Sequence, residues 1–153
     1  MNTRIRFARL AALLVVAMMA SIGQTWAQQS KQVRLRARQD KAINGIEAEL
    51  RGDYRESSAP IRLNAELEEI NIPVGTPVAF CLLQNGVKTK IGVDQVAMVV
   101  GIPTASVELS ANDGDTVPKV NAGDVVQAHQ SKKAPFKTNP GCGSPLLVSA
   151  AFQ

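Results

Sequence analysis

The sequence predicts an all-β fold, an antiparallel β-sandwich or small barrel of about eight to nine short strands. Polar and apolar residues alternate with a period of two in several segments, as they do in half-buried strands. Turn-forming residues recur about every ten positions, and no segment after residue 27 shows a helical heptad. Short strands joined by tight turns favour two packed antiparallel layers.

Residues 1–27 are predicted to be a cleaved secretory signal. Their apolar run, residues 10–20, is shorter than the ~20 residues of a membrane-spanning helix and follows three arginines, Arg4, Arg6 and Arg9. Thr25-Trp26-Ala27 offers a small-x-small cleavage site. Removing 27 of the 153 residues leaves 126, residues 28–153, enough for one domain. We therefore expect a periplasmic or extracellular protein with no membrane span in the mature chain.

Removing the signal changes the charge of the protein. The signal holds three of the seventeen basic residues and none of the thirteen acidic ones, so the mature net charge is +1. This value gives no support for nucleic acid as a partner. Basic residues at 31–41 precede glutamates at 47–69, and lysines return at 132–137. Charge pairing across neighbouring strands is the favoured interpretation, and a polyanion site is the alternative.

Three successive segments share one strand pattern, with apolar residues on one face and charged residues on the other. They are residues 32–38, 46–51 and 61–67, separated by turn-prone residues at 42–45 and 57–60. In an antiparallel pair, outward arginines of the first strand would lie opposite outward glutamates of the second.

The centre of the chain differs, since residues 78–83 are apolar on both faces, as in a buried central strand. Asn85-Gly86 then predicts a tight hairpin turn into a strand at 87–93. Residues 94–104 are ambiguous between a strand and a helical turn, and Pro103 is expected to end either. Further strands are predicted at 106–110, 124–128 and 146–152. The expected core residues are Val33, Leu35, Ile46, Leu50, Leu63, Leu67, Phe80, Leu82, Leu109 and Val125.

Cys81 and Cys142 are the only cysteines, and an even count in an exported chain favours a disulfide. Redox or metal chemistry is the less favoured alternative, because the chain has no CxxC spacing and one histidine.

The segment NDGDTVPKVNAGDVV, residues 112–126, raises the question of a calcium site. Asp113, Asp115 and Asp124 fall at positions 1, 3 and 12 of an EF-hand loop. Val117 and Pro118 occupy positions 5 and 6, where a ligand and a glycine are needed. We therefore expect these aspartates to serve backbone turns, with a weak calcium site of another type as the alternative.

The segments EEINIPVGTPV, LSANDGDTVPKVNAGDVV and LLVSAAF resemble those of a group of small exported bacterial β proteins. That group carries an N-[LI]-P-x-G-T segment, a D-G-x-x-V-P-x-V-x-A-G-D segment and a short closing strand. The resemblance covers most of residues 33–152 and implies the β fold and export. Because the group has no established activity, the resemblance supplies no site residues. This chain departs from it at 94–104 and 129–145.

Catalytic patterns are missing from the sequence. His129 is the sole histidine, and the chain has no G-x-S-x-G segment whose serine it could activate. We expect His129 to be exposed at a strand end. The chain also lacks a P-loop, a G-x-G-x-x-G segment and zinc-ligand spacing, and has few aromatic residues to hold a sugar.

We therefore expect a non-enzymatic, monomeric module without a cofactor. Such a module would bind a protein, a glycan or an envelope surface through its loops or a sheet edge. The alternative is a small metal-dependent protein that uses the loop at 112–124.

Overall fold

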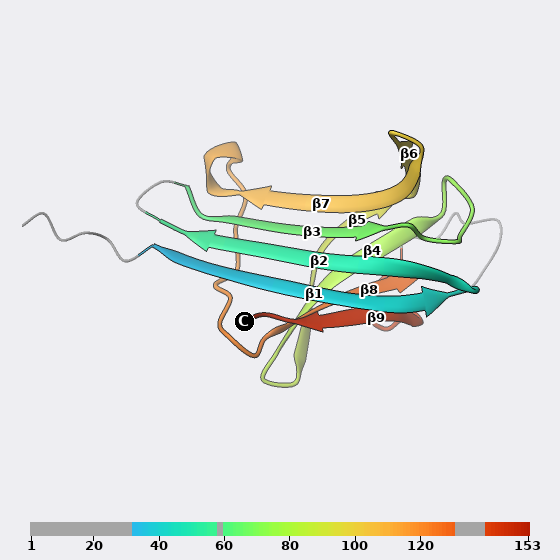
Figure 1. Ribbon diagram of the computed structural model, residues 1–153. Coiled ribbons are helices and arrows are strands. Elements are labelled where there is room, and N and C mark those ends of the chain that lie inside the picture. Colours follow the sequence, from blue (N-terminus) through green and yellow to red (C-terminus); the bar gives the residue numbers. More distant parts are fainter. Residues whose placement is uncertain (1–31, 58–59, 131–139) are drawn as a thin grey trace, which may run out of the picture. The chain divides into compact units, whose positions relative to one another are not determined.

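Two antiparallel sheets form the described part of the protein (Figure 1). The computed structural model describes residues 32–57, 60–130 and 140–153. The predicted β-sandwich is confirmed, with two separate sheets rather than one closed barrel. The predicted signal, residues 1–27, lies outside the described residues.

The first sheet has five strands in the order β1-β2-β3-β7-β6, and the second has four in the order β5-β4-β8-β9. The strands are β1 (Val33–Ile43), β2 (Ile46–Glu56), β3 (Arg62–Glu68), β4 (Pro77–Gln84), β5 (Val87–Gln95), β6 (Ala97–Val99), β7 (Ile102–Ser110), β8 (Val125–Gln130) and β9 (Leu146–Ala151). In the described ranges the only helical turn is the 3-10 helix η1 (Ala111–Asp113), and no helix there has the length and hydropathy to cross a membrane.

Three hairpins close through two-residue turns whose residues have positive φ angles. Asn44-Gly45 joins β1 to β2 with φ angles of 50° and 84°, and Asn85-Gly86 joins β4 to β5 with 48° and 81°. Asparagine and glycine tolerate these angles, so both turns agree with the local sequence. The third turn, between β6 and β7, is Val100-Gly101, with φ angles of 51° and 83°. A β-branched residue is strained at positive φ, which is why the sequence did not predict this hairpin.

The core lies between the sheets and contains most of the predicted residues. Leu50, Leu63, Leu67, Phe80 and Leu82 are fully buried, whereas Val33, Leu35, Leu109 and Val125 are half-buried. Ile46 is a correction, because its side chain is 49% exposed. It pairs with Ile43 directly beside the first hairpin turn, at the end of the sheet.

Two strands of the second sheet are buried on both faces. Residues 77–82 of β4 are all buried, as the continuous apolar run predicts, and so are residues 126–129 of β8. The inward face of β4 packs on the first sheet, whereas Cys81 points to the other face, which residues 140–145 cover through a disulfide with Cys142.

The last residues of the chain join the two sheets along one side. The backbone N–H of Gln153 donates to the carbonyl of Arg36 at 2.9 Å, and the N–H of Arg36 donates to the carbonyl of Gln153 at 3.1 Å. Lys41 Nζ donates to the carbonyl of Leu147 at 2.7 Å further along the same side. These bonds satisfy some of the backbone groups along the open edge of β1. β1 is also longer than predicted, because it continues to Ile43 and does not end at residue 38.

Pro103 was expected to end the element that contains it, and this prediction is wrong. It lies inside β7 and faces Met98 of β6. Val99 and Ile102 flank the two-residue turn and form a hydrogen-bonded pair. Hydrogen-bonded and non-hydrogen-bonded pairs alternate along an antiparallel ladder, so the next pair, Met98 and Pro103, has no hydrogen bonds between its members. Proline loses no ladder bond to β6 at such a position, and its carbonyl accepts a bond from Ile70 N–H at 3.4 Å.

Candidate functional sites

The predicted Cys81–Cys142 disulfide is present, with 5.9 Å between the two Cα atoms. It holds residues 140–145 against the outer face of β8. The backbone there adds a bond from Gln130 N–H to the carbonyl of Pro145 at 3.0 Å. An oxidising location is consistent with this disulfide.

His129 is buried beneath this covering segment, with only 1% of its surface exposed, so the expected exposed histidine is a correction. Its Nδ1 lies 2.7 Å from the carbonyl oxygen of Ser144, and its Nε2 lies 3.2 Å from Oε1 of Gln127. The Ser144 hydroxyl instead accepts a bond from the N–H of Gly141 at 3.2 Å. His129 therefore contacts a backbone carbonyl and an amide side chain, and its contact with Ser144 ties the covering segment to β8.

The aspartates of the loop at 112–124 bind the backbone. Asp115 Oδ2 accepts the N–H of Ser110 at 3.0 Å, and Asp124 Oδ2 accepts the N–H of Asn121 at 2.7 Å. Gln84 Nε2 also donates to Asp124, at 2.6 Å. Asp113 ends the helical turn η1. The two hydrogen-bonded carboxylates act as the turn interpretation predicts, and no three metal-ligating side chains gather within the described residues.

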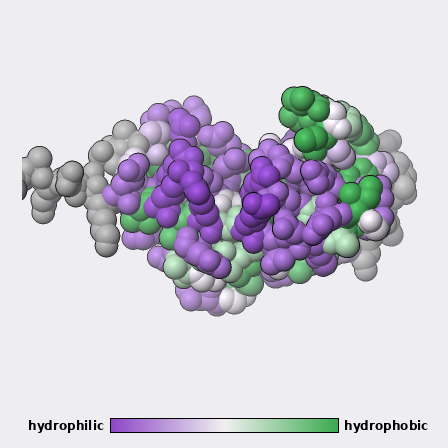
Figure 2. Space-filling model, viewed as in Figure 1, coloured by the Kyte–Doolittle hydropathy of each residue, from purple (hydrophilic) through white to green (hydrophobic). Residues whose placement is uncertain are grey.

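The outer face of the first sheet carries a ladder of charged side chains, which Figure 2 shows as hydrophilic ridges. Ion pairs join neighbouring strands and neighbouring rows. They are Arg34–Asp53, Arg38–Asp40, Arg38–Glu49, Arg51–Glu49, Arg51–Glu68, Arg55–Asp53 and Arg62–Glu108. The predicted charge pairing on this face is therefore confirmed for these residues, but the predicted register is wrong. Arg34 and Arg38 of β1 lie directly opposite arginines of β2, and their ion pairs run to diagonal or same-strand neighbours.

Carboxyl groups on this face differ in their pKa values. Hydrogen bonds from Arg51 lower the pKa of Glu49 despite its desolvation. Burial alone would raise the pKa of Asp53, but hydrogen bonds from Arg55 and Arg34 outweigh it and lower the value. Burial raises the pKa of Glu66, and the neighbouring Glu68 raises it further. The face therefore contains two carboxylates whose charged form is stabilised by neighbouring arginines, and one, Glu66, whose charged form is disfavoured by burial and by a neighbouring acid.

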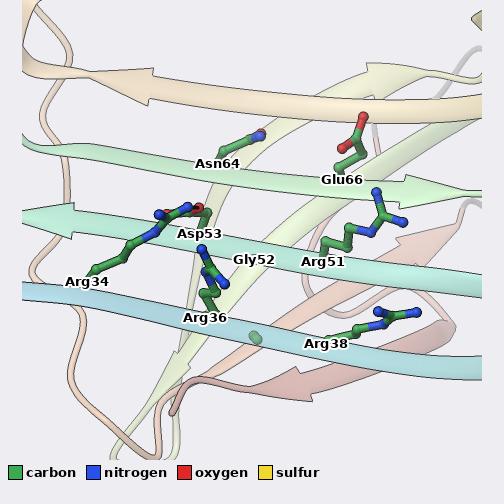
Figure 3. Close-up of a pocket in the computed structure, with 9 residues that line it drawn as sticks. Arg34, Arg36, Arg38, Arg51, Gly52, Asp53, Asn64 and Glu66 are labelled. Carbon is green, nitrogen blue, oxygen red and sulfur yellow. Dashed lines mark hydrogen bonds and ion pairs between the residues drawn. The ribbon is translucent and has the colours of Figure 1, made fainter.

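Two hollows lie on this face, on either side of the Asp53 side chain. The larger, of about 350 Å³, is lined by Arg34, Arg36, Ala37, Arg38, Arg51, Gly52, Asp53, Asn64 and Glu66 (Figure 3). The smaller, of about 140 Å³, is lined by Asp53, Arg55, Arg62, Asn64 and Glu108. Charged and polar side chains make up most of both linings, and each hollow is a valley between cross-strand rows of side chains.

Exposed apolar side chains gather at one end of the sandwich. Of the eight large ones within the described residues, seven belong to segments that meet at the end where the β1–β2 and β6–β7 turns lie: Ile46, Val74, Met98, Val99, Val100, Ile102 and Leu146. Figure 2 shows the hydrophobic tip of the β6–β7 hairpin at this end. Val87, the eighth, lies beside the β4–β5 turn, which projects away from the β6–β7 hairpin (Figure 1). We call the seven residues the apolar end.

The fold and these surfaces define the protein as an all-β sandwich with two distinctive faces. In the comparisons with known proteins, no family model, curated protein or solved structure matches the chain. The resemblance to the group of small exported β proteins thus stays a prediction.

Sequence reasoning missed both distinctive surfaces. The apolar end combines residues from four separate segments, which only the topology brings together. The one local signal was the apolar stretch at 97–102, since a glycine follows four apolar residues there.

Proposed function

We propose that the protein is an exported, non-enzymatic module that docks through its apolar end into an apolar groove of an envelope protein. The observation that carries this proposal is the tip of the β6–β7 hairpin. Val100 is 97% exposed there and has a φ angle of 51°. Valine in this conformation costs about 1–3 kcal/mol, and its side chain gains nothing from burial within the chain.

The other two hairpins show how the same turn is made without strain. Both use Asn-Gly, whereas this turn uses Val-Gly in the same two-residue geometry. An apolar residue retained at a strained and exposed position is expected where a partner buries it. Val74 and Ile102 extend the apolar surface on either side of the tip, which a groove on a partner would cover.

A protein groove fits this surface better than a lipid bilayer does. The apolar end has no exposed tryptophan, tyrosine or phenylalanine among the described residues, and these anchor proteins at the membrane interface. β7 pairs with β3 along most of its length, and Val96, directly before β6, bonds to Gly75 and Thr76, so the hairpin projects from a hydrogen-bonded support.

The test uses site-specific photo-crosslinking in the exporting cell. A photoreactive side chain at position 100 should give one defined protein adduct, whereas the same side chain at position 87, an exposed valine outside the apolar end, should not. Val100→Asn should reduce the adduct formed from a photoreactive group at position 98. The same substitution should raise the free energy of unfolding by about 1 kcal/mol, because it removes the strained valine. Equal crosslinking from positions 87 and 100, or an adduct unaffected by Val100→Asn, would count against the proposal.

A further inference from the structure

Three arginines lie directly opposite one another on neighbouring strands of the first sheet. Arg55 of β2 faces Arg34 of β1 on one side and Arg62 of β3 on the other. Like charges in directly opposed positions destabilise an antiparallel sheet. We call these three residues the arginine row.

Too few carboxylates surround the arginine row to balance its charge. Asp53 serves both Arg34, at 2.6 Å, and Arg55, at 3.1 Å. Glu108 contacts Arg62 only at 3.7 Å, and both side chains are more than half exposed. A salt bridge of this length and exposure contributes little.

Arg36 adds a fourth positive charge beside the row. It faces Asp53 in the β1–β2 register, but both Asp53 oxygens already accept bonds from Arg34 and Arg55. Within the described ranges Arg36 has no carboxylate partner. Its backbone is fixed by the two bonds to Gln153. Asp53 and Glu108 are the carboxylates paired with this group of four arginines, which leaves an excess of two positive charges. Glu66 also lines the larger hollow, but it faces Arg51 on the neighbouring strand.

The two hollows place these cations along one path across the strands. Arg34 and Arg36 line the larger hollow, and Arg55 and Arg62 line the smaller one. Figure 3 shows the Arg34, Arg36 and Asp53 side chains converging above β1 and β2, apart from Arg38 and Arg51. A guanidinium group presents a planar fork of donors that matches a carboxylate or a sulfate.

We propose that the arginine row and Arg36 bind a linear anionic polysaccharide, whose charged groups lie in the two hollows as the chain crosses from β1 to β3. This surface is separate from the apolar end, so the inference does not depend on the docking proposal. An oxyanion there relieves the repulsion within the row and gives Arg36 a partner.

The rest of the face favours a narrow chain over a broad anionic membrane. Asp40, Glu49 and Glu68 occupy directly opposed positions three rows further along the same strands. This acidic row would repel a flat negative surface that covered the whole face. The apolar end, which could insert into lipid, lies at the far end of the strands from the arginine row.

The aromatic residues argue against a nucleic acid strand. Single-stranded nucleic acids bind through aromatic side chains on which bases stack. Tyr54, Phe80 and Phe152, the described aromatic residues, are all buried. A sugar chain with an acidic group on each unit needs only the guanidinium contacts.

Binding of polygalacturonate and dextran sulfate to the mature protein at low ionic strength tests the proposal. Arg55→Gln/Arg62→Gln should bind the preferred polymer at least about tenfold more weakly than the wild type, because two charge-assisted contacts are lost. Lys88→Gln/Lys90→Gln changes the net charge equally through two exposed lysines of β5 and should bind as the wild type does. The arginine variant should unfold close to the wild-type temperature, since the repulsion removed from the row offsets the lost Arg55–Asp53 bonds. Its binding should depend less on salt, with the slope of log Kd against log salt falling by roughly one to two.

Further arms decide the class of ligand. Anionic vesicles and a single-stranded oligonucleotide, at equal concentrations of charge, should bind more weakly than the preferred polysaccharide. Tighter binding of either one would overturn the assignment in its favour. Equal losses in the arginine and lysine variants would show attraction by net charge alone. Absence of binding to both polymers would also overturn the proposal.

Discussion

Gly52 lies directly beneath the ring of Phe152, and a Cβ atom added to Gly52 would lie 2.8 Å from Cζ of that ring. The ring is buried, and the neighbouring cross-strand residues, Ala37 and Ala65, are also small. This row of small residues leaves the space in which the end of the chain packs against the first sheet.

Gly52→Ala should therefore destabilise the protein by about 1–3 kcal/mol through overpacking. Urea unfolding measures the loss. Phe152→Leu in the Gly52→Ala background should recover part of it, because a smaller side chain faces the added methyl group. Strict additivity of the two substitutions would show that the close contact does not carry the effect.

The sequence predicted the fold because the signals of the strands are local. Alternation in β1 to β3, the apolar run of β4 and two Asn-Gly turns all agree with the observed structure. The prediction failed where a distant segment decides the outcome. His129 is buried because the disulfide brings residues 140–145 over it.

The candidate surfaces were harder to predict for the same reason. The sequence showed separate groups of arginines and glutamates, and the expectation that arginines of β1 face glutamates of β2 was wrong. Register decides that Arg34, Arg55 and Arg62 form one row, and a shift of one residue would have removed it. The strained turn at Val100 contradicts local preference, so no propensity rule predicts it.

Two carboxyl groups of the outer face, those of Asp53 and Glu66, should affect the free energy of unfolding in opposite directions as the pH changes. The pKa of Asp53 is lowered from its ordinary value of 3.8, so its charged form stabilises the fold above that value, and the contribution is lost as pH falls through the folded-state pKa. Asp53→Asn should therefore cost about 1 kcal/mol at neutral pH and less in acid.

Glu66 should behave in the opposite way, and it serves as the matched comparison. Its pKa is raised from 4.5, so the charged form is penalised in the fold once the pH exceeds the folded-state pKa. Glu66→Gln should raise the free energy of unfolding at neutral pH and have little effect below pH 4.5. Urea unfolding of both variants between about pH 3 and pH 7 measures the two trends. Parallel trends in the two variants would contradict the assignment.

Removal of the disulfide should destabilise the protein strongly. Cys81 and Cys142 are 61 residues apart, and closing a loop of this length contributes about 4 kcal/mol in the chain-entropy model. Cys81→Ala/Cys142→Ala should lower the free energy of unfolding by a comparable amount. Hydrogen exchange should show faster exchange of the Gln130 amide, which bonds to Pro145. Non-reducing peptide mapping checks the bond itself, and two alkylatable thiols in protein recovered from an oxidising compartment would refute it.

The turn at Gly123 and the hydrogen bond at Asp115 should differ sharply in their tolerance of substitution. Gly123 has a φ angle of 92° and donates to the carbonyl of Phe152 at 2.9 Å, so it fixes the loop to the end of the chain. Gly123→Val should cost at least about 1–3 kcal/mol, because a β-branched residue is strained at positive φ, whereas Gly123→Asn should cost less. Asp115→Asn keeps an oxygen that can accept the Ser110 N–H and should change stability by no more than about 0.5 kcal/mol.

Thermal unfolding of the wild type and Asp115→Asn with calcium and with chelator tests the metal alternative. A rise in Tm with calcium that Asp115→Asn abolishes would replace the turn role by a cation site, since only a ligand bound to the native state raises the midpoint.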